Sequence, residues 1–192
     1  MRAKASLIAA LFLAAGLRPS AALPLFDAAN ASLRAPAAAI QTNTADYLRN
    51  SSLGSLTLAA SSAIAVERSH DGDVRRFARG VLNDPGANER TLSSALSRAG
   101  ISLALPDSVD REHAALVEQL TSVSDGDFDL NYLKQQVRFD QSALRLNLAY
   151  AKDGRDEDLR HYAAAAVPDI RGRLTLAERL LRKLAPRVAS AR

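Results

Sequence analysis

Three histidines are the side chains of this chain that most resemble metal ligands. Glu67 stands three positions before His70, the spacing that places a carboxylate and an imidazole on one helical face in di-metal bundles. Asp158 and His161 repeat that spacing as a weaker analogue. His70 adjoins a predicted turn and His161 lies off the apolar stripe of its helix, so we interpret both as solvated surface residues. A metal site at these positions is the alternative.

The remaining polar patterns do not indicate a reaction. The chain has no cysteine, no Ser-His-Asp pattern, no Gly-rich phosphate loop and no zinc spacing. His113, beside Glu112, is expected to be exposed. Asp125, Asp127 and Asp129 resemble the alternating acids of a calcium loop, but no glutamate follows at the required distance, so they predict a turn and a helix start. We therefore expect a non-enzymatic protein that needs no cofactor.

The N-terminus is typical of a secretory signal peptide. Arg2 and Lys4 precede an apolar run over residues 6–17, and small residues follow, which predicts cleavage after Ala22. A membrane anchor is the alternative. The run of about 12 residues is much shorter than the ~20 that cross a bilayer. No second apolar stretch approaches that length, so we expect no transmembrane segment after cleavage and a periplasmic location, with association with the outer membrane left open.

Charge changes when this segment is removed. The full chain has 25 basic and 21 acidic side chains. Removal of residues 1–22 deletes Arg2, Lys4 and Arg18 and no acid, which leaves 22 basic and 21 acidic side chains. The nearly neutral product does not indicate a nucleic-acid-binding surface.

Composition and periodicity predict an all-α fold. Alanine and leucine are abundant, whereas the strand-forming residues valine and isoleucine are sparse. After an Ala-rich leader over residues 23–43, we expect four long helices at 44–70, 73–99, 127–152 and 156–185 and a short one at 108–122. Such helices are best buried as an antiparallel four-helix bundle over residues 44–185. Residues 186–192 form a basic tail.

The second long helix contains a break. Pro85 and Gly86 are unfavourable inside a helix, whereas Asp84 is a good N-cap and Pro85 a good first helical residue. The sequence Asn83-Asp84-Pro85-Gly86 therefore predicts that this helix kinks or restarts here. A binding turn is the alternative.

Five motifs in a fixed order resemble a known family. They are Val74-Arg75-Arg76-Phe77-Ala78, Asn83-Asp84, Leu105-Pro106, Asp127-Phe128-Asp129 with Tyr132-Leu133, and Val167-Pro168. Together they resemble the family called domain of unknown function 4142, often labelled a predicted outer membrane protein, over residues 44–184. The resemblance implies a ferritin-like fold in an exported protein of unresolved role.

Histidines at three inward positions of this family imply a metal site. The matching positions of this chain are Pro85, Asp140 and Arg173, and none of them is a histidine. The acidic residue often seen in the family's first helix is not evident in residues 56–61 either. The resemblance therefore implies a divergent member in which the metal site has been lost.

Helical periodicity places two of these residues toward the core. Asp140 lies on the apolar stripe of Leu133, Val137, Leu144 and Leu148. Arg173 lies on the apolar stripe of its own helix, which consists of Ala163, Ala166, Ile170, Ala177, Leu180 and Leu184. The first long helix is expected to bury a separate stripe, made of Leu48, Leu56, Ala59, Ala63 and Val66. Because buried single charges are costly, we predict that Asp140 and Arg173 pair across the bundle, with Asp84 nearby. The alternative is that both charges reach solvent at the bundle ends.

The C-terminal stretch is basic and has two interpretations. Cations near the end of a helix complement its dipole, and they can also contact an anionic envelope surface. Glu178 is the acid among them, and the cations are Arg171, Arg173, Arg179, Arg182, Lys183, Arg187 and Arg192.

Taken together, these patterns predict a non-enzymatic, exported bundle that acts as a structural or interaction module of the cell envelope. Its partner would be an unidentified envelope protein or an anionic envelope surface. The alternative function is a metal-binding, ferritin-like redox or metal-storage protein.

Overall fold

The computed structural model describes residues 44–83 and 85–190, and every regular element in them is an α-helix. The predicted signal peptide, the leader and Asp84 lie outside the described residues. The elements are α2 (Thr44–Arg68), α3 (Gly72–Asn83), α4 (Pro85–Arg98), α5 (Arg111–Thr121), α6 (Asp125–Asp153) and α7 (Glu157–Ser190). None of these helices has the length and apolar character needed to cross a membrane.

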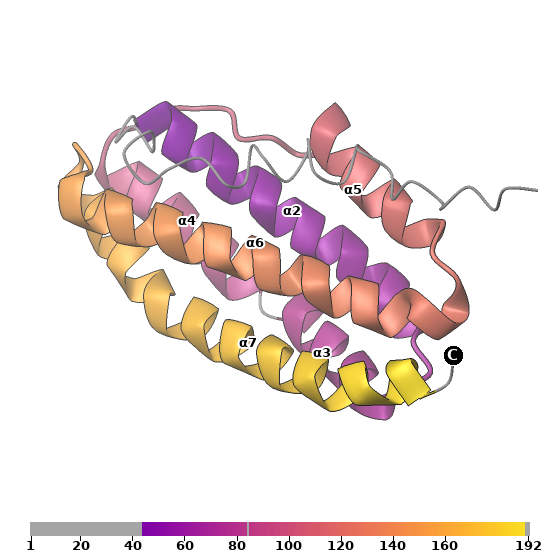
Figure 1. Ribbon diagram of the computed structural model, residues 1–192. Helices are drawn as coiled ribbons and strands as arrows, with labels where there is room; N and C mark the ends of the chain where they lie inside the picture. Colours follow the sequence, from indigo (N-terminus) through magenta and orange to yellow (C-terminus); the bar gives the residue numbers. More distant parts are fainter. Residues whose placement is uncertain (1–43, 84, 191–192) are drawn as a thin grey trace, which may run out of the picture.

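Four antiparallel rods make up the bundle, and the consecutive helices α3 and α4 together form one of them (Figure 1). The long helices α6 and α7 share the most extensive contact, α2 packs on α3 and α6, and α4 packs on α7. The short helix α5 lies outside the bundle against α2 (Figure 1). The predicted all-α, ferritin-like four-helix bundle with one extra short helix is confirmed.

Helix boundaries follow local capping. α3 ends at Asn83 and α4 begins at Pro85, so the predicted restart is confirmed. The predicted turn over residues 125–127 is wrong, because these residues form the first turn of α6. α7 runs to Ser190 rather than ending near residue 185. Gly100 ends α4 with a φ of 65°, a left-handed conformation that glycine adopts without a steric penalty.

The apolar core consists of two clusters along the bundle axis. One joins the second half of α2 to α3, α5, α6 and the end of α7, and includes Phe77, Phe128 and Tyr132. The other joins the first turns of α2 to α4, the end of α6 and the start of α7. In that second cluster Tyr47 and Tyr150 stack with ring centroids 3.9 Å apart.

Two predicted apolar stripes need correction, whereas the stripe of α7 is buried or half-buried throughout. On α6, Leu133 is buried but Leu148 is 43% exposed. On α2, Ala63 is exposed, and the buried face is instead made of Tyr47, Leu48, Leu53, Thr57, Leu58, Ser61, Ser62 and Ala65. The α2 prediction failed because alanines occur on all sides of this helix, so they do not identify the inward face, and because hydroxyls were not counted as core residues.

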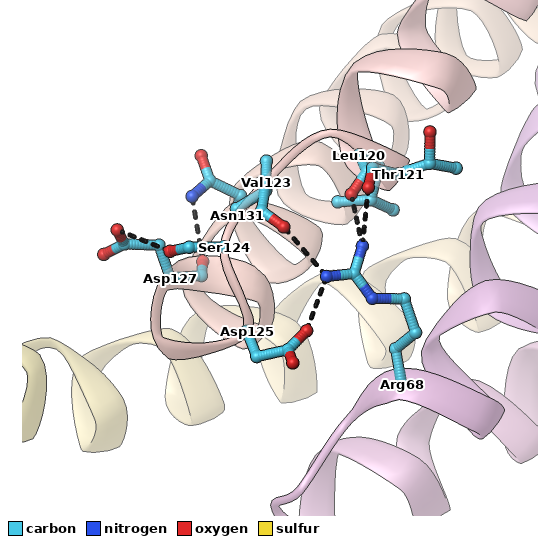
Figure 2. Close-up of polar contacts among 8 residues, drawn as sticks. All are labelled: Arg68, Leu120, Thr121, Val123, Ser124, Asp125, Asp127 and Asn131. Atoms are coloured by element: carbon cyan, nitrogen blue, oxygen red, sulfur yellow. Dashed lines mark hydrogen bonds and ion pairs between the residues drawn. The ribbon is translucent and has the colours of Figure 1, made fainter.

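Arg68 joins the end of α2 to the connection between α5 and α6 (Figure 2). Its guanidinium donates to the carbonyl oxygens of Leu120 (3.1 Å), Thr121 (3.0 Å) and Val123 (2.8 Å) and to Asp125 Oδ1 (2.7 Å). The same group lies 4.5 Å from the centre of the Phe128 ring. One side chain thereby satisfies carbonyls at the end of α5, which have no partners within that helix.

Replacement of Arg68 by alanine should therefore lower the free energy of unfolding by about 2–3 kcal/mol, because charge-assisted hydrogen bonds to carbonyls are lost. Arg68→Lys should recover less than half of the loss, since one ammonium cannot reproduce the planar fork. Urea denaturation measures both. Arg98→Ala, which removes a pair with Asp158 that is exposed on both sides, is the control and should cost less than about 1 kcal/mol. Equal losses for Arg68→Ala and Arg98→Ala would contradict the assignment.

Candidate functional site

An ion pair between α6 and α7 lies at the centre of the site. Arg173 donates to Asp140 Oδ1 from Nη2 at 2.6 Å and from Nε at 2.8 Å. The Asp140 side chain is fully buried and the Arg173 side chain is 14% exposed. The structure thus brings together the two charged residues that the sequence places inward. Pro85 is the first residue of α4, and Asp84 lies outside the described residues.

A row of buried polar side chains extends from the ion pair along α6. Tyr132, Gln136 and Asp140 follow one another at intervals of four residues, so they lie on one helical face. Gln136 donates from Nε2 to Ser61 Oγ at 2.9 Å, and the hydroxyls of Tyr132 and Ser62 lie 2.9 Å apart. All five side chains are buried, so polar contacts connect α2 to α6 inside the core. Sequence reasoning missed this row, although its regular spacing was a usable signal.

Two acceptor oxygens in this row have no hydrogen-bond partner. They are Asp140 Oδ2 and Gln136 Oε1, and both are buried. An ionised carboxylate can only accept hydrogen bonds, whereas a protonated Asp140 carboxyl would supply a donor. Burial raises the pKa of Asp140 above its usual range, and the nearby Arg173 guanidinium only partly offsets that effect.

A cleft of about 480 Å³ opens between α2 and α6 beside the start of α5, and α7 forms its inner wall. Arg173 reaches this wall, so the ion pair lies between the cleft and the core. The cleft has both polar and apolar lining. Its apolar residues include Leu53, Leu58, Phe139, Leu146 and Ile170.

The rim of the cleft contains an Asp–His pair. Asp110 is the N-cap of α5, because its Oδ1 accepts from the backbone N–H of His113 at 3.1 Å. The same oxygen lies 2.7 Å from His113 Nδ1, and the imidazole is only 16% exposed. The expectation that His113 is exposed is therefore wrong. Its position is fixed by helix capping, which residue spacing did not reveal. Arg49 lies 3.6 Å from the other carboxylate oxygen of Asp110.

The residues at the inward positions do not fit a metal ion. A guanidinium stays protonated and cannot donate an electron pair to a metal, and here it binds Oδ1 of the Asp140 carboxylate. Across residues 44–83 and 85–190, no group of three or more His, Asp or Glu side chains could hold a metal ion. His70 is exposed, and His161 is 77% exposed with Glu157 Oε1 3.7 Å away, so both are surface residues as expected.

Comparison with known proteins identifies the fold and the family. The model of the family described as "Domain of unknown function (DUF4142)" matches residues 29–180, so the match begins within the predicted leader. The crystal structure of a DUF305 fragment from Deinococcus radiodurans is similar in fold, with 21% identity and a TM-score of 0.61. That match covers 72% of this chain and 95% of the fragment. No curated protein sequence matches the chain.

The raised pKa of Asp140 predicts a pH dependence of stability. The folded state binds this proton more tightly than the unfolded state, whose carboxyl has a pKa near 3.8. The contribution of Asp140 to stability is therefore fully present below that pH and is lost as the pH rises through the raised pKa.

Asp140→Asn has no titrating group at this position and is the reference. The free energy of unfolding of the wild type minus that of Asp140→Asn should fall as the pH rises from 3 to 7. Urea denaturation at half-unit pH intervals measures this difference. A difference that rises over the same range would mean that Arg173 outweighs burial and that the pKa is lowered.

Proposed function

The chain belongs to the DUF4142 family, and from this membership we propose that it is a non-enzymatic, exported helical bundle that acts as an interaction module of the cell envelope. The signal-peptide pattern of residues 1–22 supports export to the periplasm. The nearly neutral charge after cleavage argues against a general nucleic-acid-binding role. Contact with the envelope, including the outer membrane, would then occur through the surface of the bundle.

The observation that carries this proposal is the ion pair between Asp140 and Arg173. Metal chemistry in four-helix bundles uses carboxylates and imidazoles that project inward from facing helices. Here one inward position contributes a cation and another a carboxylate that is already bound to it. A fixed positive charge at this place repels a metal ion. We therefore assign the pair a structural role, and a metal-dependent redox or storage activity is the alternative that must be excluded.

The cleft above the ion pair supports an interaction role. Its size suits a side chain or short segment of a partner, and its lining combines apolar walls with a polar rim. The Asp–His pair at the rim is held by capping of α5, so this part of the surface is preorganised. An unidentified envelope protein is the partner that this surface would take.

The proposed loss of the metal site predicts that the wild-type chain, purified without chelator, contains metal at much less than one equivalent. Its thermal midpoint should not rise when iron, copper, zinc or manganese is added, because the inward site holds no suitable ligand set. Elemental analysis and thermal denaturation make the two measurements.

Restoring the three histidines gives the matched comparison. The triple variant Pro85→His, Asp140→His, Arg173→His should gain metal-dependent stabilisation, whereas Asp140→Asn with Arg173→Gln removes the pair without adding ligands and should not. Near-stoichiometric metal in the wild type would overturn the proposal whether or not the triple variant folds. If the His70→Ala and His161→Ala variants then kept that metal, the metal would be bound in the core and not by these surface histidines.

A further inference from the structure

One side of the bundle exposes mainly cations, and the acids among them are the partly exposed Asp73 and the half-buried Glu178. On α7 between residues 171 and 183, the exposed positions are Arg171, Gly172, Thr175, Arg179, Arg182 and Lys183. On α3 they are Gly72, Arg76, Arg79, Gly80 and Asn83. We call the six cations of these two stripes the basic face. The two cations of α3 are three residues apart, and those of α7 recur at spacings of eight, three and four residues, so each set lies on one side of its helix.

A single carboxylate joins the two stripes. Asp73, on α3, pairs with Arg76 Nη1 at 2.8 Å and with Lys183 Nζ of α7. These two cations lower the pKa of Asp73, so it stays ionised. α3 and α7 are neighbours that run in opposite directions (Figure 1), so the residues that follow Arg76 and precede Lys183 continue the same face. The basic face is therefore continuous across two helices.

The other four cations of this face make no ion pair with any described residue. They are Arg79, Arg171, Arg179 and Arg182. The helix dipole does not account for them, because its effect falls off within the last turn. α3 has no cation in its last turn, and Lys183 is already seven residues from the end of α7 at Ser190. Without a partner, neighbouring cations on one face repel each other.

The charge distribution of the whole chain makes this face distinctive. After removal of residues 1–22 the basic and acidic side chains are nearly equal in number, so the chain as a whole is not strongly basic. Around α5 and at the connection between α6 and α7, by contrast, exposed cations such as Arg111, Lys152 and Arg155 alternate with acids. The excess of cations on the face formed by α3 and α7 is therefore a local feature of this surface.

We propose that the basic face binds the surface of an anionic phospholipid membrane through lipid phosphate groups. This inference rests on the proposed function, since it names the envelope component that an exported bundle would contact. The exposed positions of the face include no aromatic side chain on which nucleic-acid bases could stack. They include no large apolar side chain either, so attraction is electrostatic and the bundle stays outside the lipid tails.

Vesicle binding tests the proposal directly. The full chain is mixed with vesicles of phosphatidylcholine alone or with one third phosphatidylglycerol, and sedimentation measures the bound fraction. Neutral vesicles report any insertion of the N-terminal apolar run. Binding to the anionic vesicles should exceed that to neutral vesicles and should weaken strongly between 50 and 300 mM salt, because salt screens exposed charges.

The decisive variant replaces Arg79, Arg171, Arg179 and Arg182 by glutamine and leaves the Asp73 pairs intact. Each cation near an anionic surface contributes roughly fivefold in affinity, so the four together should reduce binding by several hundred-fold. The matched control replaces Arg111, Lys134, Lys152 and Arg155, which are exposed elsewhere on the chain, by glutamine. It has the same net charge as the decisive variant and should keep most of the binding.

Three outcomes overturn the inference. They are the absence of wild-type binding to anionic vesicles at low salt, an equal loss in both variants, and tighter binding to a DNA duplex than to vesicles at equal phosphate concentration. The metal measurements are independent of the vesicle measurements. A chain that contains no metal and does not bind vesicles would therefore overturn this inference and leave the proposed function in place. Metal in the core together with normal vesicle binding would overturn the proposed function and leave the membrane-binding inference in place.

Discussion

A buried carboxylate is costly to ionise without a partner, and the pairing of Asp140 with Arg173 relates the positions of the two central helices. Asp140 is fully enclosed, so α6 must present it to α7 at the level of Arg173. The most extensive helix contact in the described chain is the one between these two helices. Through Gln136 and Ser61 the same face of α6 is also hydrogen-bonded to α2. Three of the four rods thus depend on one register.

The ion pair also limits what the interior can do. Apolar replacements of buried ion pairs are often as stable as the pair itself, so we infer that this pair serves mainly to specify the register of the two helices. A guanidinium at an inward position removes the electron-pair donor that a metal site needs. The surfaces that we propose for interaction are the cleft beside α5 and the basic face of α3 and α7.

Much of this arrangement follows from the sequence, because it depends on local rules. Asp84-Pro85-Gly86 indicates a restart, and α4 begins at Pro85. The inward placement of Arg173 follows from the apolar stripe predicted for α7, whose residues are buried or half-buried in the structure. Where side chains act over long distances, sequence reasoning fails. Periodicity cannot show that Arg68 reaches carbonyls at the end of α5, that His113 turns back to Asp110, or that α2 buries hydroxyls rather than Ala63.

The central claim is that Asp140 and Arg173 are energetically coupled in the core, and a double-mutant cycle with Asp140→Leu and Arg173→Met measures that coupling directly. Each single replacement leaves one charge of a buried pair without its partner and should cost about 3 kcal/mol or more in the free energy of unfolding. The double replacement should cost much less than the sum of the two, which gives a coupling of about 2 kcal/mol or more. Additivity within about 0.5 kcal/mol would contradict the account.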